Sequence, residues 1–235
     1  MWFPAKKYFA SCLHIFFPHV CEGCGTDFLY PHDFLCAKCI HRLPTTGYFD
    51  ISANPVEKIF YGRLRIEKAA AAFYFTKASL VQHLVSELKY KNNKAAGFFF
   101  GRMMGQYLAN TTRFESVDLL IPLPLHPRKE HLRGYNQAKI ICDGIQSIWK
   151  KPVEENALKR ALFRETQTHQ NRVNRWQNME GIFELAAPEL VKNRHILLVD
   201  DVITTGATLE AAGSALLNTT GTRLSIAAAA FTLRH

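Results

Sequence analysis

The sequence lacks several features that would assign it to a protein class at once. No run of about 18 apolar residues occurs in the 235-residue chain, so we expect no membrane-spanning helix. There is no internal repeat and no low-complexity segment. Hydrophobic residues make up 48% of the chain and charged residues 21%, which excludes wholesale disorder, collagen and coiled coil. The length suits one mid-sized domain, or one domain with a small appendage.

A complete export signal is also missing. Lys6 and Lys7 could form its basic start, and Phe9–Cys12 resembles a cleavage box. Too few residues separate them, because a signal needs about 7–15 apolar residues at that point. The apolar residues between Phe9 and Phe17 instead have the spacing of a short amphipathic helix. We therefore expect a cytoplasmic location, where thiols remain reduced.

The net charge of +9 is not spread evenly along the chain. Residues 61–116 carry nine basic and three acidic side chains, and residues 117–181 carry eleven and seven. The flanking segments are close to balance. A basic central region suits a phosphate-rich ligand or a nucleic acid. Because there is no continuous run of Lys or Arg, a merely basic surface is the alternative interpretation.

Four cysteines near the N-terminus form the pattern C-x2-C-x11-C-x2-C: Cys21, Cys24, Cys36 and Cys39. Each C-x2-C pair can bend so that both thiolates face one tetrahedral ion, and Gly25 directly after Cys24 relieves the tight turn. The spacing favours a structural Zn²⁺ ribbon. Iron in a rubredoxin-like site is the second interpretation, and disulfides are the third. A metal would stabilise a segment too small to have a core of its own.

The rest of the chain alternates between two patterns. We predict an N-terminal part over residues 1–60, with the short helix and the ribbon, and an α/β domain over residues 61–235. In the domain, strands are predicted over 69–75, 117–122, 195–199 and 224–233, and helices over 78–91, 97–110, 135–149 and 207–217. Strands alternating with helices indicate a largely parallel sheet flanked by helices.

The passage Ile196–Thr208 is the most specific in the sequence. Asp200 and Asp201 follow four apolar residues, at the end of a buried strand where open α/β sheets bind ligands. A loop rich in threonine then leads into a helix, so loop amides and the helix N-terminus can hold an anion, and Gly206 lets the backbone approach closely. Carboxylates beside a phosphate site suit ribose hydroxyls, Mg²⁺ or both. A turn whose polar residues only cap the helix is the alternative.

This passage resembles the phosphoribosyl pyrophosphate (PRPP) motif of type I phosphoribosyltransferases. The resemblance implies that Asp200 and Asp201 hold the ribose hydroxyls at the catalytic centre, with Mg²⁺ accompanying PRPP. It implies a 5′-phosphate site formed by Thr204, Thr205, Gly206, Ala207 and Thr208.

Further passages resemble the ComF family of competence proteins: Ile121–Lys129, Arg133–Ala138, Ser86–Lys91, the stretch from Arg160 to Phe183, and the tetracysteine ribbon. The resemblance runs from about residue 16 to the C-terminus. It implies a type I phosphoribosyltransferase-like domain behind an N-terminal zinc ribbon, and a link to the handling of imported single-stranded DNA.

Cations near the predicted pyrophosphate loop are further candidates for PRPP contacts: Arg128, Lys129, Arg133 and, at a helix end, Lys89. Residues 164–175 read as a flap that closes over the ligand, or as a plain surface loop. We expect a PRPP-binding protein that transfers a phosphoribosyl group and releases pyrophosphate. Two alternatives stay open: a non-catalytic sensor of PRPP or a nucleotide, and a single-stranded DNA-handling protein.

Overall fold

The structure is a computed structural model, and it describes residues 19–30, 33–160 and 182–233. The chain divides into two compact units, residues 1–43 and 44–235. Each unit is described by itself below. The predicted amphipathic helix before residue 18 and the predicted flap over 164–175 lie outside the described residues.

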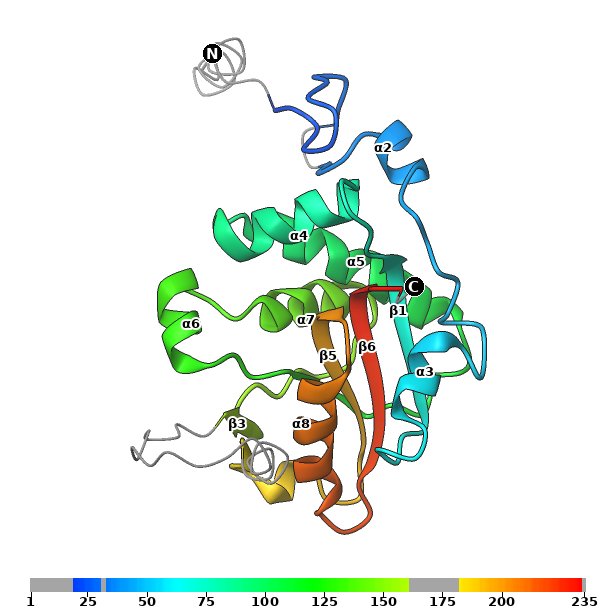
Figure 1. The fold of residues 1–235 in the computed structure, drawn as a ribbon, viewed down its shortest axis with the longest axis vertical. Helices are drawn as coiled ribbons and strands as arrows, with labels where there is room; N and C mark the ends of the chain where they lie inside the picture. The colour runs from blue at the N-terminus through cyan, green and yellow to red at the C-terminus, as the bar shows by residue number, and fades with distance from the viewer. Residues whose placement is uncertain (1–18, 31–32, 161–181, 234–235) are drawn as a thin grey trace, which may run out of the picture. The chain divides into compact units, whose positions relative to one another are not determined.

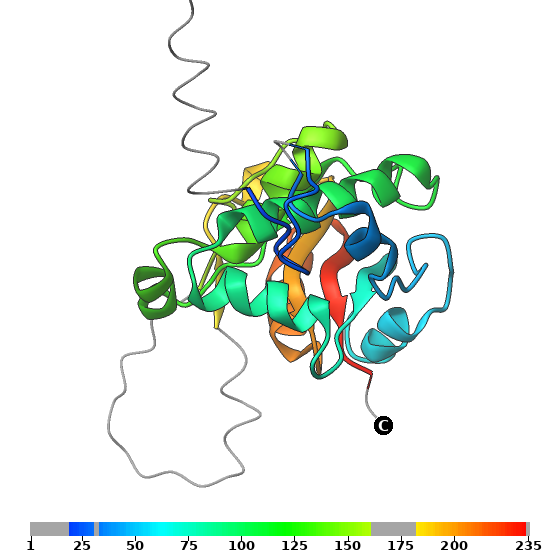
Figure 2. The ribbon, with the colours of Figure 1, turned by 90° about the horizontal axis from the view of Figure 1, so that it is seen from above.

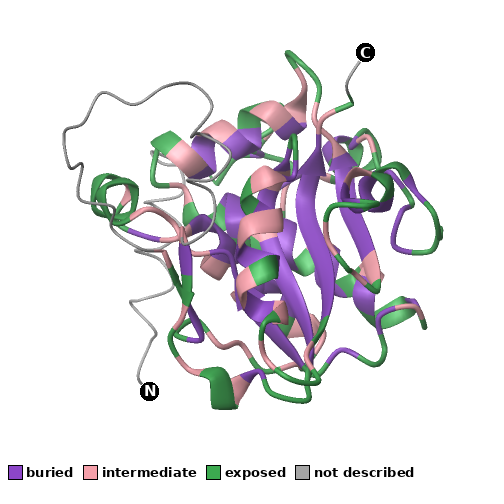
Figure 3. Cartoon of the chain, turned by 60° about the horizontal axis from the view of Figure 1, so that its bottom comes forward, coloured by how far each residue is buried: buried purple, intermediate pink, exposed green. Residues whose placement is uncertain are grey.

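A four-stranded parallel sheet forms the centre of the larger unit. Its order is β1 (Lys68–Tyr74), β6 (Arg223–Phe231), β5 (His195–Ile203) and β2 (Leu119–Pro122). Nearly every residue of these strands is buried, because helices cover both faces of the sheet (Figure 3). The alanines of β1 and β6 keep these strands thin enough for helices to pack closely on both sides.

Two layers of helices enclose this sheet (Figure 1). One face carries α5 (Lys94–Asn110) and α7 (Gln137–Ile148), with α4 (Leu80–Tyr90) packed on α5. The other face carries α3 (Pro55–Phe60) and α8 (Ala207–Leu217). A Cβ at Gly101 of α5 would lie 2.2 Å from the carbonyl oxygen of Ile141 in α7. The two helices can therefore pack this closely only with glycine at that point.

The structure confirms the predicted α/β fold with its parallel sheet. The predicted strand over 69–75, an alanine run that also suits a helix, is observed as β1 over residues 68–74, because both faces of this segment are buried. Several features, including helix α3, were not predicted. The segment after β2 forms the short helix α6 (Pro127–Arg133), which begins at a His126 cap and ends at Gly134 with φ 75°. A hairpin pairs β3 (Leu158–Arg160) with β4 (Phe183–Leu185), and a 3-10 turn, η3 (Pro188–Leu190), follows it.

Residues 44–60 pack with the larger unit, although the sequence-based division placed them with the ribbon. The Thr46 N–H donates to the carbonyl of Ala72 at 3.0 Å. Asn54 caps α3 and donates to the carbonyl of Ala69 in β1 at 2.8 Å. These contacts attach the segment to the edge strand of the sheet, so α3 packs against β1.

The smaller unit contains one described helix, α2 (Ala37–His41), and the two knuckles that carry the cysteine pairs. Figure 2, seen from above, shows these described residues as loops leading into a single short helix. Among all the described residues, no helix is both long and apolar enough to cross a membrane.

Candidate functional site

The two acidic residues of the central motif lie in the second half of β5. Because side chains alternate along a strand, Asp200 and Asp201 point to opposite faces of the sheet. Asp201 is buried, and its Oδ1 lies 3.0 Å from Nζ of Lys89 in α4. Asp200 is half-buried, and its Oδ1 accepts the N–H of Asp201 at 2.8 Å. On the face of the sheet to which it points, Asp200 interacts electrostatically with Arg160 of β3.

The environment of Asp200 disfavours its charged form. Burial raises the pKa of Asp200 to about 7, and the negative charge of Asp201 adds to this rise. The Asp201 N–H, Lys89 and Arg160 oppose the shift without reversing it. A carboxyl group whose pKa is raised by burial and by a neighbouring acid is a frequent property of functional sites.

The loop after β5 is open to solvent and well suited to an anion. Thr204, Thr205 and Thr208 are exposed, and Gly206 has the left-handed φ of 74° that turns the chain into α8. As the N-cap of α8, Gly206 contributes no side chain that would occupy the first N–H groups of the helix. The Ala207 N–H donates to the Thr205 hydroxyl at 3.3 Å, and the following N–H groups of the first turn face the loop.

Arg63, which sequence reasoning missed, holds this loop from behind. Its Nη1 donates to the carbonyl of Thr205 at 3.0 Å and to the carbonyl of Ile59 at 3.1 Å, and its Nη2 pairs with Glu210 in the first turn of α8. A Cβ at Gly206 would lie 2.8 Å from Ile59. The segment after α3 thus fixes the loop's backbone, but it lies far away in sequence and carries no motif.

The predicted cations differ in how close they come to the acids. Lys89 contacts Asp201 directly. Arg133, at the end of α6, donates to Oε1 of Gln137 at 2.7 Å, and its guanidinium lies 5.6 Å from the ring centroid of Tyr90 in α4. Arg128 and Lys129 are exposed on α6. Because β2 and β5 are parallel neighbours, α6 follows the same edge of the sheet as the Thr204–Thr208 loop.

Two clefts are linked to the acid pair by one cation each, although neither acid lines them. The first has a volume of about 540 Å³ and lies between the segment after β2, the start of α7 and β3; Arg160 lines it. The second has a volume of about 580 Å³ and runs along α4 from Phe75, after β1, to Tyr90; Lys89 lines it. Both volumes lie in the range of about 300–1,000 Å³ that small-molecule sites occupy.

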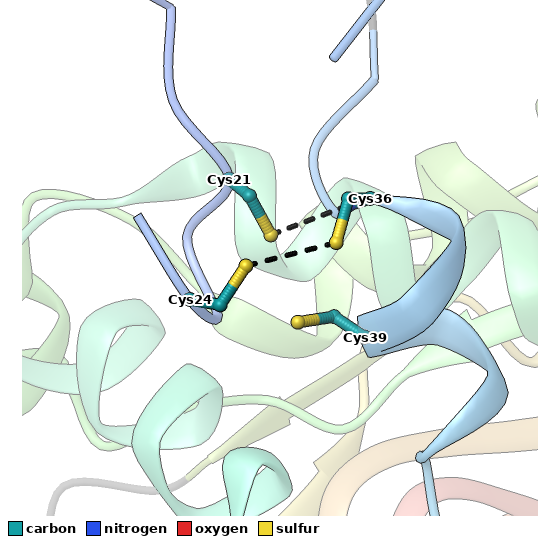
Figure 4. Close-up of side chains that lie close together, drawn as sticks. All are labelled: Cys21, Cys24, Cys36 and Cys39. Carbon is teal, nitrogen blue, oxygen red and sulfur yellow. Dashed lines mark hydrogen bonds between the residues drawn. The ribbon is translucent and has the colours of Figure 1, made fainter. Parts of the chain in front are cut away.

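The four cysteines of the smaller unit come together as their spacing predicts. Their sulfur atoms all lie within 4.8 Å of one another, and Cys24 Sγ is 3.7 Å from Cys36 Sγ (Figure 4). Four thiolates about 2.3 Å from one Zn²⁺ ion would be separated by about 3.8 Å. Gly25 has a φ of 73°, as the predicted tight turn requires. The cluster could therefore hold a metal ion such as zinc.

Backbone groups prepare one of these thiols for the charged state. The N–H groups of Cys36 and Gly23 point at Cys21 Sγ at 3.2 and 3.4 Å. Although burial raises the pKa of Cys21, backbone hydrogen bonds lower it to about 6. Burial and the neighbouring thiols raise the pKa of Cys39 to about 12. Metal ligation requires all four thiols to be deprotonated, so an ion would have to overcome the second effect.

The fold and the site together define a class of protein: an α/β domain of the type I phosphoribosyltransferase kind, with a tetracysteine cluster preceding it. In sequence, residues 139–234 match the phosphoribosyl transferase domain family. A solved glutamine PRPP amidotransferase from B. subtilis, complexed with ADP and GMP, aligns over 58% of this chain and 26% of its own, with 18% identity and a TM-score of 0.42.

Several curated proteins are similar over most of the chain. Competence protein F of Haemophilus influenzae is 28% identical over 204 residues, covering 82% of this chain and 76% of that protein. DNA utilization protein YhgH of Escherichia coli O157:H7 is 25% identical over 201 residues, covering 84% and 78%. Competence protein ComFC of Bacillus subtilis is 31% identical over 99 residues, covering 42% and 38%. These relatives, together with the phosphoribosyl transferase match, support a ComF-family protein with a phosphoribosyltransferase-like domain.

Proposed function

We propose that this protein binds PRPP with Mg²⁺ at the end of β5. The observation that carries the proposal is the pairing of Asp200 and Asp201 with an exposed, glycine-turned threonine loop at the start of a helix. Acids for hydroxyls and main-chain amides for a phosphate are the two halves of a sugar-phosphate site. The phosphoribosyl transferase family match over 139–234 supports the same ligand.

Different residues would contact different parts of PRPP. Asp200 and Asp201 accept hydrogen bonds from the ribose hydroxyls, and the Thr204–Thr208 loop donates N–H and hydroxyl groups to the 5′-phosphate. The α6 cations Arg128, Lys129 and Arg133 would contact the pyrophosphate, and Lys89 would contact PRPP beside Asp201. Mg²⁺, when bound with PRPP, would neutralise charge on the pyrophosphate oxygens.

Phosphoribosyl transfer is the reaction for which such a site is suited. The bond from ribose C1 to pyrophosphate breaks with its electron pair leaving on pyrophosphate, and the acceptor's lone pair forms the new bond to C1. The carboxylates of Asp200 and Asp201 would stabilise the positive charge that develops on the ribose. A protein that binds PRPP without turnover would act as a sensor through the same contacts.

For the ribbon, we propose Zn²⁺ held by Cys21, Cys24, Cys36 and Cys39 in a structural role. All four protein ligands are present, so a tetrahedral ion would have no open position for a substrate. The short connection between the two knuckles supports this role, because such a small unit needs the ion in order to fold.

Isothermal titration with PRPP and Mg²⁺ tests the binding proposal. We expect saturable binding by the wild type and at least about a tenfold loss in Asp200→Asn, since an amide replaces the carboxylate at the hydroxyl site. Asp50→Asn is the matched control, because Asp50 is exposed and far from β5 in the sequence of the same unit. Equal binding by wild type and Asp200→Asn would overturn the proposal.

Two further measurements separate the alternatives. Pyrophosphate release in the presence of an acceptor distinguishes an enzyme from a sensor. Binding of a single-stranded oligonucleotide that weakens steeply with salt would identify a nucleic-acid ligand, as the names of the relatives suggest. If oligonucleotide binding were found in Asp200→Asn as well, DNA would be bound outside the PRPP site.

A further inference from the structure

The four thiols of the ribbon differ in how far solvent can reach them. Cys21 and Cys39 are buried, with 1% and 7% of their surfaces exposed, whereas Cys24 is exposed and Cys36 is half-buried. Cys36 also lines a cleft of about 450 Å³ beside Phe28, so a small molecule can approach this residue. Each knuckle therefore has one buried thiol and one accessible thiol.

The two accessible thiols also lie close together. Cys24 Sγ is 3.7 Å from Cys36 Sγ, and Figure 4 shows the two side chains pointing toward each other from different knuckles. The Cys21 sulfur is held in place by other groups, because it accepts the N–H groups of Cys36 and Gly23. A disulfide between Cys24 and Cys36 would need only a shortening from 3.7 Å to the roughly 2.05 Å of an S–S bond.

The larger unit offers an oxidant no comparable pair of thiols. Cys142 in α7 is the one cysteine in the sequence of residues 44–235, and it is 0% exposed. Burial raises the pKa of the Cys142 thiol well above its usual range, which keeps the thiol protonated and unreactive. Among the cysteines that the structure describes, oxidation is therefore directed to Cys24 and Cys36.

We propose that Cys24 and Cys36 form a reversible oxidation site, at which a hydroperoxide links the two knuckles by a disulfide and the ribbon releases its metal ion. The inference rests on the metal ligation proposed above for the four cysteines. It concerns a modification of these ligands and is independent of PRPP binding, because all four cysteines belong to the smaller unit.

The modification is a two-electron oxidation with hydrogen peroxide as the oxidant. The Cys24 thiolate attacks one peroxide oxygen, the O–O bond breaks, and the other oxygen leaves as hydroxide, which takes up a proton to form water. The Cys36 thiolate then attacks the sulfur of the Cys24 sulfenic acid, so that the S–S bond forms and hydroxide leaves to become a second water. In total, two thiolates are oxidised, one peroxide is reduced and two protons are consumed.

The disulfide changes what the ribbon can bind. Cys21 and Cys39 remain as thiolates, and two ligands are too few for a closed tetrahedral site, so the ion is released. The disulfide joins the knuckles across the 11 residues between Cys24 and Cys36, and it therefore keeps Cys21 and Cys39 near each other. A dithiol reductant then restores all four ligands, which makes the modification reversible.

Treatment of the zinc-loaded full chain with hydrogen peroxide tests the inference. A zinc-sensitive dye measures release of the ion, and alkylation followed by peptide mass spectrometry identifies which cysteines are paired. We expect release of the bound zinc, a disulfide between Cys24 and Cys36, and a reduced Cys142 as the internal control. Dithiothreitol with added Zn²⁺ should then restore the starting zinc content.

Histidine substitutions separate the accessible thiols from the buried ones. Histidine is itself a Zn²⁺ ligand, so Cys24→His and the matched control Cys39→His each keep four ligands. Zinc release by peroxide should slow at least about tenfold in Cys24→His, which lacks the attacking thiolate, and should stay within about twofold of wild type in Cys39→His. Cys36→His removes the other half of the pair and replaces Cys24→His if that variant binds no zinc.

A zinc content that peroxide leaves unchanged would overturn the inference. Disulfides confined to Cys21 with Cys24 and Cys36 with Cys39 would do the same, as would equal rates of zinc release in Cys24→His and wild type. Zinc loss that dithiothreitol and Zn²⁺ do not reverse would also overturn it, because the modification would then be irreversible. A purified chain that neither contains nor takes up zinc would instead refute the metal site proposed above.

Discussion

Replacing Asp200 with asparagine should stabilise the protein while weakening its proposed binding of PRPP. Asparagine keeps an oxygen at the position that accepts the N–H of Asp201, and it removes the charge that burial opposes. The rise of the Asp200 pKa from 3.8 to about 7 corresponds to about 4 kcal/mol of destabilisation by the ionised carboxylate. Because Asp200 is only half-buried and solvent screens part of this penalty, we expect about half of it, roughly 2 kcal/mol, in Asp200→Asn.

The size of this effect depends on pH. Between about pH 4 and pH 7 the folded protein holds a proton on Asp200 that the unfolded chain has lost, so wild-type stability falls as the pH rises through this window. Asp200→Asn lacks this loss. The two proteins should therefore have similar free energies of unfolding near pH 4 and should differ most above about pH 7.

Equilibrium urea unfolding, followed by circular dichroism from about pH 4 to pH 8, measures this difference. Asp201→Asn is the contrasting variant, because it removes the partner of Lys89 and should lower stability by about 1–2 kcal/mol. Asp200→Asn less stable than wild type at pH 8, or a difference independent of pH, would refute the reasoning. A gain in stability together with a loss of PRPP binding would indicate that the Asp200 carboxylate lowers the stability of the protein and serves ligand binding.

Three other predictions concern the supports of the site. Arg63→Gln should weaken PRPP binding about fivefold in calorimetry, because the Thr205 carbonyl loses its donor, whereas the exposed Arg65→Gln should not. Glu57→Gln should lower the free energy of unfolding by about 3 kcal/mol, because it leaves Arg113 without its buried carboxylate. Chelation of the ribbon metal should speed hydrogen exchange over residues 19–43 and leave 44–235 unchanged; faster exchange throughout would contradict a separate unit.

The sequence was informative wherever one local pattern determines the structure. Strand β5, the threonine loop and α8 follow from a buried apolar run, two acids and a glycine, and α8 spans Ala207–Leu217 as predicted. The cysteine cluster follows from spacing alone, since each knuckle is built from adjacent residues. The sequence reveals that both residues of the acid pair are carboxylates, but it does not reveal that burial and partners differ between Asp200 and Asp201.

The missing parts depend on contacts between residues distant in sequence. Arg63 reaches Thr205 and Glu210 across more than half of the larger unit, and no motif marks it. The attachment of residues 44–60 to the sheet depends on Asn54 and Glu57, whose partners lie in β1 and after α5. Such contacts follow from the topology, which the strand pattern predicts only as a parallel sheet of unspecified order.

The alternation of side chains along β5 determines which groups the acids can reach. Asp200 and Asp201 point to opposite faces of the sheet, so each acid meets a different cation, Lys89 for Asp201 and Arg160 for Asp200, and each cation lines a separate cleft. In the proposed function, a sugar held at this pair would have a space beside each acid. The opposite orientation of two adjacent acids is therefore the feature that would allow the site to hold groups on both sides of one sugar.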